Sequence, residues 1–164
     1  MRLRDPFDPT RNPKGRLKMM QTCVSIDIAC PIETVFRYTN EKVEDWSLTV
    51  IEDQPTNDLR GVGATFRCVT EDHGCRMEFQ GEVTAWSEPT QSSIQMIGER
   101  FDIEVDYAFE KIGDGTRVTQ TSRVQPKGIM KIVLFFIGWI MAKQGCDAAE
   151  KELQSLKAKL ESNL

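Results

Sequence analysis

The sequence predicts an α+β protein in which a curved antiparallel sheet wraps around one long C-terminal helix. Two observations support this fold class. Alternating apolar and polar residues indicate a run of strands from residue 48 onward, and the only long helical periodicity follows that run, in residues 127–164. Strands in a run with the long helix last are typical of an antiparallel sheet packed on a helix. A chain of 164 residues suits one domain with its own core.

Residues 1–18 are expected to form a flexible basic tail ahead of a single domain of residues 19–164. The tail has three prolines and few apolar residues, a composition that does not support a packed core. Its six basic and two acidic residues give it a net charge of +4, although the whole chain carries −4. The acidic balance of the domain argues against nucleic acid as a partner, since no basic patch with interleaved aromatic residues is present.

The cysteines indicate a reducing compartment. Five cysteines are scattered without a Cys-x-x-Cys pair, which predicts free thiols in a cytoplasmic protein rather than a disulfide framework. A single histidine, His73, leaves no spacing suited to zinc, so no metal or other cofactor is expected. The N-terminus lacks the apolar stretch of a signal peptide.

The chain opens with a strand and two short helices. Residues 21–29 alternate in polarity, which predicts a half-buried strand with Val24, Ile26 and Ile28 on its buried face. Pro31 then suits the first turn of a helix. The buried side of that helix is formed by Ile32, Val35 and Phe36. A second short helix is expected around residues 41–46.

Three turns predict the registers of the hairpins that follow. His73-Gly74 suits a two-residue turn, because glycine accepts a positive φ. That turn places Thr70 opposite Met77, Cys68 opposite Phe79, Phe66 opposite Gly81 and Ala64 opposite Val83. A turn at Gly98-Glu99 would place Met96 opposite Phe101 and Ile94 opposite Ile103. A turn at residues 112–115 would place Phe109 opposite Val118 and Tyr107 opposite Gln120.

The C-terminal helix has two different halves. Ala149, Leu153, Leu156 and Leu160 recur at helical spacing in the second half, which predicts a stripe that packs on the sheet. The first half, residues 129–142, is apolar nearly all round, but its run of about 14 residues is shorter than the roughly 20 that cross a membrane. Small residues on its inward face would allow either close approach to the sheet or a space beneath the helix.

The outward face of the same first half is also apolar. It is formed by Val133, Phe136, Ile137 and Ile140. Because monomers rarely expose such patches, something is expected to cover this face. The candidates are the loop of residues 54–61, a second subunit in a homodimer, or a membrane surface, and the sparse flanking charge favours the first two.

The sequence resembles the START-like, or Bet v 1-like, superfamily (SRPBCC), and within it the polyketide cyclase/dehydrase type 2 group. The resemblance is carried by IACPIETVFRYTNEKVEDW (residues 28–46), GVGATFRC (61–68), FQGEVTAWSEPTQ (79–91), YAFEKIGDGTRVTQTSRVQPKG (107–128) and KELQSLKAKLE (151–161). It implies a helix-grip fold, in which a seven-stranded antiparallel sheet grips the helix and encloses a cavity. Members bind hydrophobic small molecules such as lipids, sterols, polyketides or quinone tails, and only some are enzymes.

A ligand cavity of this kind would be lined by large apolar side chains with a few polar anchors. Methionine and phenylalanine suit an adaptable apolar pocket. The expected ligand-binding residues are Trp46, Phe66, Met77, Phe79, Met96, Phe101, Tyr107, Phe109, Gln120, Phe135, Trp139 and Ala142, with Trp46 near the mouth. The few polar groups expected to point inward, Tyr107, Gln120 and Ser122, could orient a carbonyl or hydroxyl group of the ligand, or could satisfy one another.

Catalytic residues are not evident. An enzyme needs an acid or base that reaches the cavity, yet His73 lies on a turn and the acidic residues of the later strands have the outward phase. Cys68 and Cys146 point inward without a histidine partner, and such thiols are usually inert. The sequence therefore favours binding or carriage of a hydrophobic small molecule. The alternative is a cyclase- or dehydratase-like enzyme acting on an aromatic or polyketide substrate.

Overall fold

The computed structural model describes residues 20–162, apart from the side chains of residues 134–143. The predicted tail of residues 1–18 lies outside the described residues. So do the side chains of three expected ligand-binding residues, Phe135, Trp139 and Ala142.

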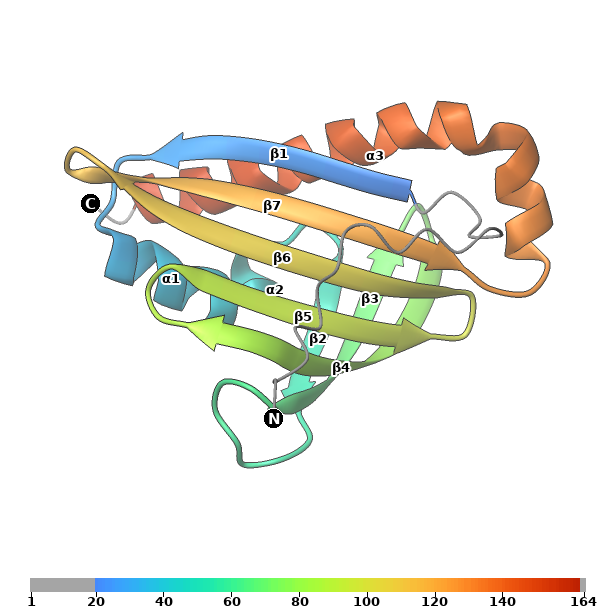
Figure 1. The fold of residues 1–164 in the computed structure, drawn as a ribbon, viewed down its shortest axis with the longest axis horizontal. Helices are drawn as coiled ribbons and strands as arrows, with labels where there is room; N and C mark the ends of the chain where they lie inside the picture. The colour runs from blue at the N-terminus through green and yellow to red at the C-terminus, as the bar shows by residue number, and fades with distance from the viewer. Residues whose placement is uncertain (1–19, 163–164) are drawn as a thin grey trace, which may run out of the picture.

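The described chain folds as one antiparallel sheet with three helices (Figure 1). The elements are β1 (Met20–Ile28), α1 (Ile32–Glu41), α2 (Val43–Trp46), β2 (Val50–Pro55), β3 (Thr65–Asp72), β4 (Cys75–Ser87), β5 (Gln91–Gly98), β6 (Phe101–Ile112), β7 (Gly115–Pro126) and α3 (Met130–Glu161). The strand order is β1-β7-β6-β5-β4-β3-β2, and every neighbouring pair is antiparallel. The predicted curved sheet with a long C-terminal helix and two short helices after the first strand is confirmed.

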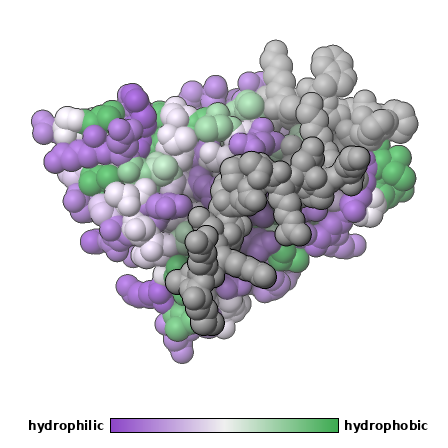
Figure 2. Space-filling model, in the orientation of Figure 1, coloured by the Kyte–Doolittle hydropathy of each residue, from purple (hydrophilic) through white to green (hydrophobic). Residues whose placement is uncertain are grey.

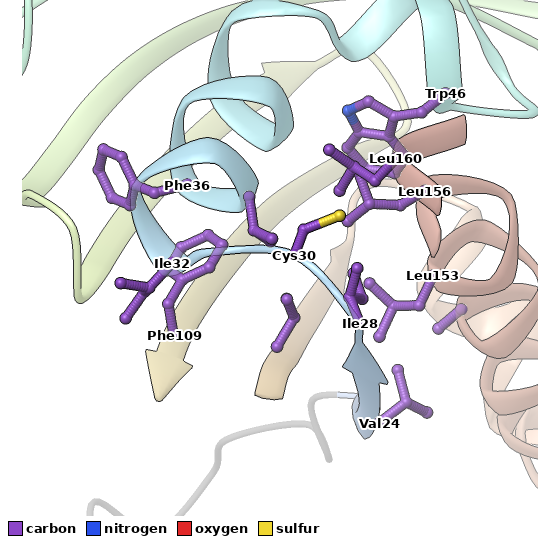
Figure 3. Close-up of a cluster of buried hydrophobic side chains, with 13 residues drawn as sticks. Val24, Ile28, Cys30, Ile32, Phe36, Trp46, Phe109, Leu153, Leu156 and Leu160 are labelled. Atoms are coloured by element: carbon purple, nitrogen blue, oxygen red, sulfur yellow. The ribbon is translucent and has the colours of Figure 1, made fainter. Parts of the chain in front are cut away.

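The packed core lies at one end of the sheet, between β1, β6 and β7 on one side and α1 and the second half of α3 on the other. Figure 3 shows Leu153 of α3 beside Ile28 of β1, and Leu156 and Leu160 near Trp46. The predicted helical stripe is therefore confirmed, with Leu156 completely buried. The predicted buried side of α1, Ile32, Val35 and Phe36, is confirmed, and Thr39 is buried with these residues.

The β3–β4 hairpin has the predicted register. His73 and Gly74 both adopt a positive φ, as the two-residue turn requires. Phe66 pairs with Gly81, and a Cβ atom on Gly81 would lie 2.2 Å from a carbon of the Phe66 ring. The aromatic ring thus covers the glycine and occupies the volume that a side chain would need. The ladder ends at Thr65, but Val83 N–H still donates to the Ala64 carbonyl.

The predicted register of the β5–β6 hairpin is wrong by two residues. Met96 pairs with Ile103 and Ile94 pairs with Val105. Gly98 does not supply the positive φ of a tight turn; instead it lies against Phe79, and a Cβ atom there would be 2.6 Å from the Phe79 ring. Because the shift is an even number of residues, the same side chains still face inward.

The third turn is as predicted, since Tyr107 pairs with Gln120 and Phe109 pairs with Val118. This register fixes the faces of β6 and β7.

Where it is not covered by grey atoms, the face seen in Figure 2 carries many hydrophilic residues among intermediate and hydrophobic ones. Ion pairs run across the outer face of the sheet between neighbouring strands. They join Arg117 to Asp27, Arg123 to Asp106 and Glu104, Lys127 to Asp102, and Arg67 to Glu52 and Glu78. The acidic residues predicted to point outward on β4 and β6 therefore have partners on that face.

Candidate functional site

The register aligns inner-face side chains into rows that cross the sheet. One row, called here the apolar row, contains one residue from each of β3 to β7: Phe66, Gly81, Met96, Ile103 and Val124. Apart from Gly81, its members are only half-buried. Large apolar side chains on the concave face thus keep accessible surface, in contrast to the fully packed core at the other end.

A second row, closer to the core, is polar. It consists of Ser92, Tyr107 and Gln120, which lie directly opposite one another on β5, β6 and β7. It is four residues along the strand from the apolar row, or about 13 Å at the usual rise of ~3.3 Å per residue. Ser92 is 1% exposed, and its Oγ atom has no hydrogen-bond partner. Gln120 donates from Nε2 to Ser122 Oγ at 3.2 Å, but its Oε1 atom is buried without a partner.

Tyr107 occupies the middle of this polar row. Its ring stacks on Phe109 at a centroid distance of 6.2 Å. Burial raises the pKa of the Tyr107 phenol, and the negative charge of Glu152 on α3 raises it further. The hydroxyl therefore stays protonated at neutral pH and is able to donate a hydrogen bond.

A carboxyl group also lies on the inner face, at the β2–β3 side. Asp53 pairs with Cys68, and its Oδ1 atom is buried without a hydrogen-bond partner. Burial raises the pKa of Asp53 to about 6, and the nearby charge of Glu44 adds to the effect. Burial likewise raises the pKa of the Cys68 thiol to about 12, so this cysteine is a neutral thiol.

A pocket of about 530 Å³ lies where β4 extends beyond the end of β5. It is lined by residues 76–80 of β4 and by residues 97–101, which connect β5 to β6. Met77, Phe79 and Phe101, three of the expected ligand-binding residues, contribute to this lining. The pocket opens at the end of the sheet farthest from the core.

The structure separates the expected lining residues into two groups. Phe66, Met77, Met96, Phe101, Tyr107 and Gln120 are half-buried on the inner face. Phe79 and Phe109 are buried, at 2% and 4% exposure. The expectation that Trp46 stands near a mouth is wrong. Trp46 is 4% exposed because α2 turns it into the core, where its Nε1–H donates to the Thr39 carbonyl at 3.2 Å.

Two polar residues on the inner face were not expected from the sequence. Ser92 could have been found by continuing the alternation of β5 backward from Ile94. Asp53 could not, because a bulge between Val50 and Glu52 breaks the alternation of β2 before it reaches this residue.

The small-residue face of α3 approaches the sheet closely at Gly145. A Cβ atom there would lie 3.2 Å from Thr22 Cγ2 of β1. Of the two outcomes that small residues allow, close approach applies at this position.

Residues 20–162 show neither a metal site nor a membrane span. No group of three or more potential metal ligands is found among the described side chains. Within the same part of the chain, no helix is long and apolar enough to cross a membrane.

Comparison with known proteins places the chain in a family. The sequence profile of the family described as polyketide cyclase/dehydrase and lipid transport matches residues 19–161. The chain belongs to this family. The expected START-like, Bet v 1-like membership is thereby confirmed. A search of curated proteins found no match.

Solved structures of similar proteins share the helix-grip fold. The protein TTHA0849 from Thermus thermophilus is 18% identical, with a TM-score of 0.74 over 87% of this chain and 98% of its own. A START superfamily protein from Mycobacterium smegmatis is also 18% identical, with a TM-score of 0.70 over 88% and 99% of the two chains. Ara h 8.0201 is 12% identical, with a TM-score of 0.62 over 88% and 99%. At such identities the likeness establishes the fold alone.

Proposed function

We propose that this protein binds or carries a hydrophobic small molecule (a lipid, quinone or polyketide-like compound) between the inner face of the sheet and α3. The observation that carries the proposal is the half-buried apolar row in the concave face of a folded domain. Large apolar side chains normally lose their accessible surface in a core, and those that keep it in a concavity mark ligand sites. The five free cysteines support a cytoplasmic location.

Polar atoms on the same face support this proposal. Asp53 Oδ1, Thr70 Oγ1, Ser92 Oγ and Gln120 Oε1 are all buried without a partner. Leaving a buried polar group unpaired costs about 1–3 kcal/mol, so proteins rarely keep several. A bound molecule that supplies hydrogen bonds would offset this cost.

Native mass spectrometry of the purified protein tests the proposal. We expect an adduct with the mass of a copurified apolar compound that disappears after extraction with organic solvent and refolding. A spectrum of the bare chain alone, together with failure of the extracted protein to take up an apolar fluorescent probe, would contradict it.

We further propose that the start of α3 contacts a second copy of the chain. Ile129, Ile132 and Val133 are 74%, 62% and 40% exposed. Val133 belongs to the apolar face expected from the sequence, whose other members, Phe136, Ile137 and Ile140, lie outside the described side chains. The loop of residues 54–61 lies at a different end of the molecule from the start of α3 (Figure 1), so it does not cover these side chains. The same native spectrum should contain a dimer, and an exclusively monomeric protein would contradict this contact.

A second candidate function, a cyclase- or dehydratase-like enzyme, is favoured by one specific observation. Such chemistry needs an acid or base inside the cavity with a pKa near the working pH. Asp53 fits this requirement better than any residue expected from the sequence. It lies on the inner face, and burial places its pKa at about 6.

Replacing Asp53 tests its ionisation. Its pKa of about 6 exceeds the ordinary value of 3.8, so between these values the folded protein binds more protons than the unfolded chain. The free energy of unfolding should therefore fall as the pH rises from about 4 to 6. Asp53→Asn should remove this fall and increase stability at pH 7.5 by about 1–2 kcal/mol, after allowance for solvent screening of a part-exposed group.

The measurement is urea unfolding of wild type and variant between pH 4 and 8. Asp58→Asn, which changes an exposed aspartate in the β2–β3 connection, is the matched control and should follow the wild-type curve. Parallel curves for wild type and Asp53→Asn would show that Asp53 ionises normally and would remove it as a candidate acid or base.

A further inference from the structure

The polar row has the hydrogen-bonding pattern of a recognition site. Ser92 Oγ is free to donate or accept, whereas Gln120 Oε1 is a carbonyl oxygen and can only accept, and Nε2 of the same amide donates to Ser122 Oγ. The Tyr107 hydroxyl, which makes no hydrogen bond with another described residue, lies between them in the register. A ligand group that forms hydrogen bonds with all three residues must be able both to donate and to accept a hydrogen bond.

Charged groups do not fit this position. The inner-face residues of β5, of residues 101–109 of β6 and of β7 include no lysine or arginine, and Lys111, at the far end of β6, is exposed. The charged group that acts on Tyr107 is Glu152, which would repel an anion. Glu152 already accepts hydrogen bonds from Leu48 N–H and Thr49 Oγ1, so it is not free to pair with an ammonium group. An ion buried here would lose its hydration without gaining a partner.

We propose that the polar row binds the hydroxyl group of an uncharged, otherwise apolar alcohol or phenol. The hydroxyl donates to Gln120 Oε1 and accepts from Tyr107 or Ser92. The apolar body of the molecule extends along the strands, over Ile94 and Val105, toward the apolar row about 13 Å away. This inference rests on the proposed function, because it assigns the polar end of the same ligand site.

The test is displacement of an apolar fluorescent probe by a matched set of ligands at pH 8. 1-Decanol should bind at least tenfold more tightly than decanoate, which is charged, and than 1-methoxydecane, which cannot donate. A tenfold difference corresponds to about 1.4 kcal/mol, the scale of one good hydrogen bond.

Variants of the row provide the second arm. At least one of Tyr107→Phe and Ser92→Ala should weaken decanol binding about fivefold to thirtyfold, and that variant should weaken binding of the apolar probe far less. Ser92→Ala should also raise the melting temperature of the ligand-free protein by a few degrees, since it removes an unpaired buried oxygen. Thr121→Val, on the outer face of β7, is the control and should bind decanol normally.

The two arms separate the hydroxyl site from the proposed function. If the probe binds but decanol, decanoate and the ether compete equally, the hydroxyl site is wrong while the proposed function stands. The same conclusion follows if folded Tyr107→Phe and Ser92→Ala proteins keep wild-type affinity for decanol. If neither the probe nor any ligand binds the wild-type protein, the proposed function fails and the hydroxyl site fails with it.

Discussion

Phe36→Ala is expected to lower the free energy of unfolding by about 3–5 kcal/mol, the usual cost of removing a buried phenylalanine. Phe36 is 1% exposed and joins α1 to the sheet. Its ring makes edge contacts with Trp86 at 4.9 Å and with Phe109 at 5.1 Å. Because these contacts link three elements, little relaxation of the resulting cavity is expected.

Chemical denaturation measures this loss, which should also lower the melting temperature by roughly 6–20 °C at this chain length. Leu59→Ala is the matched control, because Leu59 is 61% exposed in the β2–β3 connection and its truncation should cost less than about 0.5 kcal/mol. A loss below about 1 kcal/mol for Phe36→Ala would mean that the core is not organised around α1 as described.

The fold was largely predictable because its signals are local. The His73-Gly74 turn and the alternation of β3 and β4 determined one register, and the four-residue stripe of α3 identified the face that packs. The β5–β6 register was not predictable in the same way. Gly98 serves the packing of the Phe79 ring, a contact between distant residues that a turn rule cannot include.

The candidate site was predictable only in part. The alternation of side chains between the two faces of a strand placed Phe66, Met96 and Tyr107 on the inner face. The two-residue error in the β5–β6 register did not change the face on which they lie. This alternation does not show which inward side chains are buried in the core, because their burial depends on where α1 and α2 pack on the sheet. Trp46 was misplaced because it lies on α2, and the sequence does not show that this helix turns its side chain into the core. Asp53 was missed because a bulge between Val50 and Glu52 interrupts the alternation of inward and outward side chains along β2.

The second large effect concerns the space over the apolar row. Met96 is half-buried on the inner face of β5, between Gly81 and Ile103. A tryptophan at this position would project a bulky ring into that space, and Met96→Trp is expected to weaken binding of an apolar ligand at least tenfold. Gln95→Trp adds the same indole at the next residue, which is exposed and faces outward, and should bind like wild type.

Titration of an apolar fluorescent probe into wild type, Met96→Trp and Gln95→Trp tests the central claim most directly. Binding of a hydrophobic molecule on the inner face predicts saturable binding to wild type and Gln95→Trp, with at least a tenfold loss for a folded Met96→Trp protein. Equal affinity in all three proteins would place the probe elsewhere on the molecule, and would contradict a ligand site between the sheet and α3.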